Sequence, residues 1–231
     1  MTFLKRTGAL VLAASALAAI SSPALAQDTF KGKSAGDIVV RARALAVIPQ
    51  EKANLFAHGP LNTGIGSAKV GNDYIPELDF TYFFTDNIAA ELIAGTTRHT
   101  VKGNTILGDV DIGKVSLLPP TLTVQYHFLP KQRVSPYIGA GVNWTLFYNE
   151  DAANVSNGAV AITNTKYKNS FGWALQAGVD FALTDNVSLN LDVKKIFLKT
   201  DVTAQTSLGV PVTSKVTLDP WLIGVGVGYR F

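Results

Sequence analysis

Apolar residues alternate with small or polar residues along the last eleven residues of the chain. The first face of this segment consists of Trp221, Ile223, Val225, Val227, Tyr229 and Phe231. The second face consists of Leu222, Gly224, Gly226, Gly228 and Arg230. This period of two predicts a β-strand. Tilted by about 45°, the strand covers roughly 23 Å, close to the ~25 Å apolar band between the aromatic girdles of an outer-membrane barrel. A soluble sandwich strand also alternates, but it has no reason to carry aromatic residues at both ends.

Seven further segments alternate in the same way and predict seven more strands. They are residues 38–48, 77–84, 88–95, 121–128, 137–146, 171–181 and 187–197. Lys195 interrupts the apolar face of the last one, either as a side chain that reaches the membrane surface or as a bulge. After residue 26, no stretch has 18 consecutive apolar residues, which argues against membrane-spanning helices.

Short and long connections alternate between these segments. The short ones are residues 84–88, 129–135 and 183–187, and the first and third are near copies around Asp-Asn. The long polar ones are residues 49–73, 100–116, 149–166 and 203–215. We therefore expect an all-β fold: an eight-stranded antiparallel transmembrane β-barrel over residues 36–231, with short periplasmic turns and long extracellular loops.

The N-terminus has the features of a secretory signal peptide. Lys5 and Arg6 precede an uncharged stretch that ends in Ala24-Leu25-Ala26, so we expect cleavage after residue 26. An uncleaved anchor is the alternative. Residues 27–35 are then an N-terminal periplasmic segment, and the formal net charge falls from +3 to +1. This small charge gives no reason to expect a nucleic-acid partner. The 47% hydrophobic content excludes a disordered chain, and the absence of cysteine excludes disulfides and thiolate sites.

Several motifs in order resemble the outer membrane protein W (OmpW) family over roughly residues 36–231. They are Phe80-Thr81-Tyr82 with Thr85-Asp86-Asn87-Ile88, Leu118-Pro119-Pro120-Thr121-Leu122, Pro136-Tyr137-Ile138-Gly139-Ala140-Gly141, Ser170-Phe171-Gly172 with Gly178-Val179-Asp180, and Leu218-Asp219-Pro220-Trp221 running to Gly228-Tyr229-Arg230-Phe231. The resemblance implies a narrow pore with a hydrophobic interior, proposed to pass small hydrophobic molecules. It also implies roles discussed for the family in stress adaptation and as a receptor for bacteriocins.

The predicted strand directions place the inward-facing residues by depth. Charged residues fall in the periplasmic half: Arg41, Arg43, Glu91, His127, Asp180 and Arg230, with Asp79, Asp192 and Lys194 nearer the middle. Apolar residues fall toward the outside and are candidates for lining a ligand site: Leu45, Val47, Phe147, Ile196, Leu198, Leu218 and Leu222. We expect an apolar funnel above a charged plug. The plug is either purely structural or also a gate.

Prolines near the outer ends of the strands indicate where the wall is weakest. Pro76, Pro119 and Pro120 flank the third predicted strand, residues 88–95, and each lacks a ladder donor. They predict a lateral opening through which a solute leaves for the bilayer. Alternatively, they only terminate strands at the membrane surface.

No catalytic, metal or cofactor motif is evident, and we expect no enzyme activity. His58, His99 and His127 lack an evident Ser-His-acid arrangement. The expected location is the bacterial outer membrane, and the expected partners are its lipids, lipopolysaccharide and small hydrophobic solutes. The alternative is a structural or receptor barrel whose extracellular loops bind a bacteriocin or a host surface without transport. The oligomeric state stays open.

Overall fold

The protein is described by a computed structural model that covers residues 30–50, 52–58, 63–105, 108–152 and 162–231. The predicted signal peptide, residues 1–26, lies outside the described residues, as does the start of the predicted periplasmic segment. In the described ranges, no helix is long and apolar enough to span a membrane.

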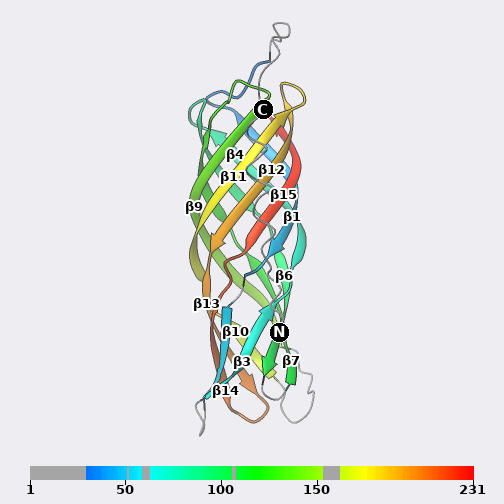
Figure 1. Ribbon diagram of the computed structural model, residues 1–231, viewed down its shortest axis with the longest axis vertical. Coiled ribbons are helices and arrows are strands. Elements are labelled where there is room, and N and C mark those ends of the chain that lie inside the picture. Colours follow the sequence, from blue (N-terminus) through cyan, green and yellow to red (C-terminus); the bar gives the residue numbers. More distant parts are fainter. Residues whose placement is uncertain (1–29, 51, 59–62, 106–107, 153–161) are drawn as a thin grey trace, which may run out of the picture.

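Eight strands close into an antiparallel ring, in the order β1–β4–β5–β8–β9–β11–β12–β15 and back to β1. Their bounds are β1 (Ile38–Ile48), β4 (Asp73–Phe83), β5 (Ile88–Ala94), β8 (Thr121–His127), β9 (Val134–Ala152), β11 (Ser170–Ala182), β12 (Val187–Phe197) and β15 (Trp221–Arg230). The ring occupies the upper part of Figure 1. Each strand matches one of the eight segments predicted from alternation, with most strand ends within a few residues, so the predicted barrel is confirmed.

The outer face of this ring is an apolar belt. Val225, Trp144 and Leu78 are 55%, 56% and 50% exposed, whereas inward residues such as Arg41 and Thr123 are fully buried. A water-soluble protein rarely exposes so large and continuous an apolar surface. The belt therefore matches the lipid-facing side of a transmembrane barrel.

The predicted long connections contain paired strands of their own, which the alternation pattern did not indicate. These strands are β2 (Lys52–Ala57), β3 (Thr63–Val70), β6 (Thr97–Thr105), β7 (Gly108–Leu118), β10 (Ile162–Tyr167), β13 (Lys199–Thr206) and β14 (Pro211–Thr217). They follow the order β10–β13–β14–β2–β3–β6–β7–β9, and we call them, with the end of β9, the outer extension. It forms the lower part of Figure 1. We use "above" and "upper" for the direction from the ring toward the outer extension, which points down in that view. Most of its inward residues are apolar, such as Leu55 and Val216. Most of its outward residues are polar, although Phe56 is exposed, so the alternation lacks the lipid-facing signature.

The short turns at the opposite end of the ring are alike in structure as well as in sequence. The Thr85 hydroxyl accepts hydrogen bonds from the backbone N–H groups of Asn87 and Ile88. The Thr184 hydroxyl accepts the equivalent pair from Asn186 and Val187. These local bonds fix two turns of matching geometry, as their near-identical sequences predicted.

Among the described strands, β9 alone belongs to both the ring and the outer extension. Every other ring strand ends near the junction, for example β1 at Ile48 and β5 at Ala94. Two apolar core clusters lie at and above this junction, one around Leu45 and Leu198 and one around Leu55 and Val115. The interior therefore becomes apolar at the junction where the ring strands end and the outer extension begins.

Candidate functional site

Two arginines from β1 fill the centre of the ring. The Arg41 guanidinium lies 3.1 Å from Asp79 Oδ1 and 3.0 Å from Asp180 Oδ2. The Arg43 guanidinium lies 2.9 Å from Glu77 Oε1 and 3.0 Å from Glu91 Oε2. Side chains alternate along β1, so both arginines point inward while Ala42 between them faces lipid.

Glycines on the neighbouring strands provide the space for these large groups. A Cβ atom at Gly226 on β15 would overlap the Ala42 carbonyl oxygen and lie 2.8 Å from Arg43 Cγ. At Gly178 on β11, a Cβ atom would overlap the Tyr137 ring, which lies across that strand. The glycine-rich inward faces of β11 and β15 are thus shaped by the residues that cross them.

Further buried groups complete what we call the charged cluster. Its members are Lys33, Arg41, Arg43, Glu77, Asp79, Glu91, Asp180, Asp192 and Lys194. Lys194 lies between Asp192 and Glu91, and the Tyr137 hydroxyl donates to Asp192 Oδ2 over 2.7 Å. Buried charges are tolerated only when paired, and these four cations and five carboxylates pair with one another. The cluster closes the axis of the ring.

The predicted plug residues do not all lie together. Arg41, Arg43, Glu91 and Asp180 belong to the charged cluster. Arg230 lies apart at the periplasmic end, where it pairs with Asp37 at 3.1 Å.

His127, the remaining predicted plug residue, packs between the rings of Phe83 and Tyr137 at the edge of the cluster. Its Nε2 lies 3.1 Å from Gln125 Oε1 and its Nδ1 lies 3.1 Å from Lys33 Nζ. It is therefore a packed and hydrogen-bonded ring that joins the cluster to its surroundings.

Sequence reasoning missed Lys33, because it precedes the first strand. Its ammonium group enters the ring and lies 2.7 Å from Asp180 Oδ2 and 3.0 Å from Ser135 Oγ. The backbone of this segment is held by Pro130, whose carbonyl accepts from Lys33 N. Uncharged members of the network were also missed: Gln125, Gln176 and Asn190. Their inward positions in the alternation were the available signal.

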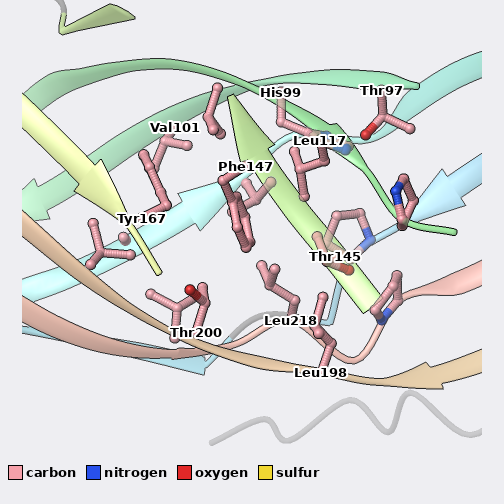
Figure 2. Close-up of a pocket in the computed structure, with 18 of the residues that line it drawn as sticks. Thr97, His99, Val101, Leu117, Thr145, Phe147, Tyr167, Leu198, Thr200 and Leu218 are labelled. Atoms are coloured by element: carbon pink, nitrogen blue, oxygen red, sulfur yellow. The ribbon is translucent and has the colours of Figure 1, made fainter. Parts of the chain in front are cut away.

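A cavity of about 190 Å³ lies above the charged cluster, between the ring and the outer extension. Its wall includes all seven residues predicted for the upper interior: Leu45, Val47, Phe147, Ile196, Leu198, Leu218 and Leu222. Figure 2 shows Phe147, Leu198 and Leu218 directed into it, together with Leu117 and Val101 of the outer extension. The sequence analysis missed the extension residues because it treated their segments as loops.

The cavity is almost entirely apolar. Its volume exceeds the ~150 Å³ of an engineered apolar cavity that holds benzene. The rings of Phe147 and Tyr167 stack with their centroids 5.5 Å apart. Burial and the Glu150 carboxylate raise the pKa of Tyr167 well above its ordinary value, so its phenol stays neutral. Burial lowers the pKa of His99, whose Nδ1 lies 3.1 Å from the Gly71 carbonyl oxygen. Apart from Glu77, which lies where the cavity meets the charged cluster and is paired with Arg43, the walls thus present neutral groups to any occupant.

The β-ladder is interrupted on both sides of the outer end of β5. Between β4 and β5 the paired residues begin at Leu78 and Ala94, so the part of β4 that contains Pro76 is paired with β1 on one side and has no ladder partner in β5 on the other. Between β5 and β8 the pairing ends at Ile93 and Thr121.

Pro119 and Pro120 lie beyond that second end, between β7 and β8. The Asn143 amide and the Thr121 hydroxyl donate to the Pro119 carbonyl and hold this link in place. The three prolines therefore border an interrupted stretch of wall, and Pro119 itself lines the cavity.

The three histidines lie in separate places. His58 contacts the Thr213 hydroxyl, His99 lines the cavity and His127 touches the charged cluster. In the described part of the chain, no group of three His, Cys, Asp or Glu side chains is arranged to hold a metal ion.

Comparisons with known proteins agree with this architecture. A family model described as the OmpW family matches residues 34–231. An uncharacterized outer-membrane protein, y4mB of Sinorhizobium fredii, is 42% identical over 97% of this chain and 93% of its own length. Outer membrane protein W of Escherichia coli is 34% identical over 93% of this chain and 98% of its own length.

Solved structures show the same arrangement of strands. The crystal structure of OprG from Pseudomonas aeruginosa has a TM-score of 0.79 and 31% identity, covering 87% of this chain and 98% of that chain. The solution structure of Escherichia coli outer membrane protein W has a TM-score of 0.56 and 31% identity, covering 86% and 99%.

Proposed function

Because the chain belongs to the OmpW family of outer-membrane proteins, we propose that it takes up small hydrophobic molecules through its upper cavity and releases them sideways into the bilayer. The observation that carries this proposal is an apolar cavity of about 190 Å³ directly above a plug of paired charges. An apolar solute gains free energy by leaving water for such a cavity.

The charged cluster supports a sideways exit rather than an axial one. A hydrophobic molecule that moved straight down would have to separate ion pairs such as Arg43–Glu77. Breaking a buried pair costs about 3–5 kcal/mol, and an apolar solute offers no compensating contact. For a molecule in the cavity, the free-energy barrier for leaving through the barrel wall is therefore lower than the barrier for passing through the charged cluster.

The interrupted wall beside β5 is the proposed exit. Ile75 and Gly95 both line the cavity, and a Cβ atom at Gly95 would lie 3.8 Å from Ile75 Cδ1 across the gap. Outward of this point, the exposed side of Pro76 faces the apolar belt. Separation of Ile75 and Pro76 from Gly95 would connect the cavity to lipid without breaking the β4–β5 ladder, which begins at Leu78 and Ala94.

A crosslink across this gap tests the exit. Cysteines replace Ile75 and Gly95, are joined by a short thiol crosslinker, and uptake of a fluorescent hydrophobic probe into proteoliposomes is measured before and after reduction. The matched control replaces Phe80 and Leu92, which are already opposite each other in the β4–β5 ladder. We expect crosslinking to slow uptake reversibly in the first variant alone.

The outcomes separate the two parts of the proposal. Unchanged uptake after complete crosslinking of Ile75→Cys/Gly95→Cys overturns the lateral exit but leaves uptake itself. Uptake equal to that of protein-free vesicles overturns transport and favours the receptor alternative, in which the outer extension binds a partner.

We also propose that the protein is not an enzyme. The separation of His58, His99 and His127 supports this proposal, because acyl or phosphoryl chemistry needs a nucleophile and a base within hydrogen-bond reach. An assay of lipid A hydrolysis by the purified protein tests it, and any turnover above that of buffer would overturn it.

A further inference from the structure

One side of the barrel carries an aromatic surface at the outer end of the ring. The rings of Trp173 on β11 and Phe197 on β12 stack with their centroids 3.9 Å apart. The ammonium group of Lys195 lies 5.0 Å from the ring centroid of Trp221 on β15. Trp173 is 50% exposed and Trp221 is 39% exposed, so these rings face the surroundings. Such aromatic residues mark the level where a bilayer meets water.

Three exposed lysines lie just beyond this aromatic surface, in the adjoining outer extension. Lys199 on β13 follows Phe197 by two residues, and Lys52 on β2 follows β1 by four. Thr217 on β14 pairs in register with both of them, so the two lysines flank the same residue. The third, Lys168, is held against β13 because the Thr200 hydroxyl donates to its carbonyl oxygen.

The charges on this side are unbalanced. Within the described residues, none of the three lysines forms an ion pair. Asp201 is opposite Lys215 in the β13–β14 ladder, and Asp219 accepts a hydrogen bond from Leu198 N. Lysines therefore outnumber carboxylates on this face.

The height of the lysines matches the headgroup layer of a bilayer. At about 3.3 Å per residue and a tilt of about 45°, two to four residues correspond to roughly 5–9 Å above the aromatic level. The polar headgroup layer extends about 5–8 Å beyond the hydrocarbon core on each side. Ammonium groups at this height meet phosphate groups, for which lysine is a common point-charge ligand.

We propose that this lysine–aromatic surface (Lys52, Lys168, Lys195, Lys199, Trp173, Phe197 and Trp221) binds a phosphorylated glycolipid of the outer leaflet, the lipid A part of lipopolysaccharide. Lys52, Lys168 and Lys199 bind its phosphates, and the stacked Trp173–Phe197 pair packs against its acyl chains. Lys195, which donates to Gln50 Oε1 and to the Asp219 carbonyl, holds the aromatic side of the surface in place. The site is on the lipid-facing side of the barrel and does not depend on transport through the cavity.

Lipid binding by the folded full-length barrel tests this site. Purified protein is titrated with diphosphoryl lipid A, and bound lipid is counted by native mass spectrometry. The test variant is Lys52→Gln/Lys168→Gln/Lys199→Gln. The control, Lys69→Gln/Lys102→Gln/Lys114→Gln, removes the same charge from β3, β6 and β7. There, Lys102 and Lys114 are opposite Asp111 and Asp151.

We expect the test variant to bind diphosphoryl lipid A at least about tenfold more weakly, because each lysine near an anionic surface contributes roughly a fivefold factor. The control variant and a Lys-to-Arg version of the test variant should bind as the parent does. Equal weakening in test and control variants would overturn the site, as would equal binding of dephosphorylated lipid A. Displacement of the lipid by millimolar inorganic phosphate would show a free-anion site instead and would overturn the lipid assignment.

Discussion

The lower and upper halves of the interior are built from the same alternation of inward and outward residues, yet they differ in content. In the lower half, the charged cluster fills the ring, and the Gln176 side-chain amide donates to both Glu91 and Asp192. In the upper half, apolar side chains such as Val101 and Leu117 leave about 190 Å³ unfilled. Buried polar groups need hydrogen-bond partners, so the space around them is filled by other polar side chains or by water. Apolar side chains need no such partners and can enclose an empty cavity. The lower half therefore stabilises the fold, and the upper half is free to accept a guest.

The largest test of this division removes one charge from the lower half. Arg43→Met should lower the free energy of unfolding by about 3–5 kcal/mol, because Glu77 and Glu91 lose their closest guanidinium partner. Unfolding by urea in lipid vesicles, followed by heat-modifiable gel migration, measures the change. The exposed control Lys69→Met should change it by less than about 0.5 kcal/mol. Parental stability of Arg43→Met would contradict a structural role for the cluster.

A second test fills the upper half. Leu117→Trp should reduce probe uptake by about tenfold or more, because the indole occupies space that the solute needs. The free energy of unfolding should change by less than about 1 kcal/mol, since the added volume enters existing free space. Leu208→Trp, at a 66% exposed turn position, is the control and should leave uptake unchanged. If Leu117→Trp destabilises the barrel as strongly as Arg43→Met does, the two halves do not divide as described.

The smallest effect concerns His99 in the cavity wall. Its lowered pKa means that the unfolded chain takes up a proton near the ordinary value of about 6.5 while the folded chain does not. Its contribution to the free energy of unfolding is therefore full above about pH 6.5 and declines as the pH falls, by at most about 1.4 kcal/mol per pH unit. Nearby Asp73 partly opposes the shift.

The parent and His99→Gln should therefore differ in the slope of stability against pH only below about pH 6.5. Urea titrations between about pH 5 and pH 8 measure both slopes. Parallel curves over the whole range would show that His99 is not buried as the structure has it.

The ring was predictable because lipid imposes a strong signal on it. A strand such as β15 exposes Ile223, Val225 and Val227 to lipid, and this forces small or polar residues such as Gly226 inward. The outer extension was not recognised because its outward residues face water, and a strand such as β3, with two glycines, is similar in composition to a loop. Strand pairing in that region depends on neighbours distant in sequence, such as β2 with β14.

The residues of the candidate sites likewise fall into those that the strand pattern predicted and those that it did not. The depths of Arg41 and Arg43 and the cavity positions of Leu45 and Leu222 followed from strand direction alone. The position of Lys33 depends on the path of a segment outside any strand, which alternation does not describe.

The continuity of β9 has a consequence for how the length of this chain can vary. At junctions such as residues 95–96, an added residue lengthens a link and leaves the strands on either side in place. Within β9 an added residue turns every later side chain to the opposite face unless a bulge absorbs it, as happens once where β9 pairs with β7 around Asn149. Insertions and deletions among related sequences should therefore collect at the junctions and at the tips of the extension, while β9 keeps its length.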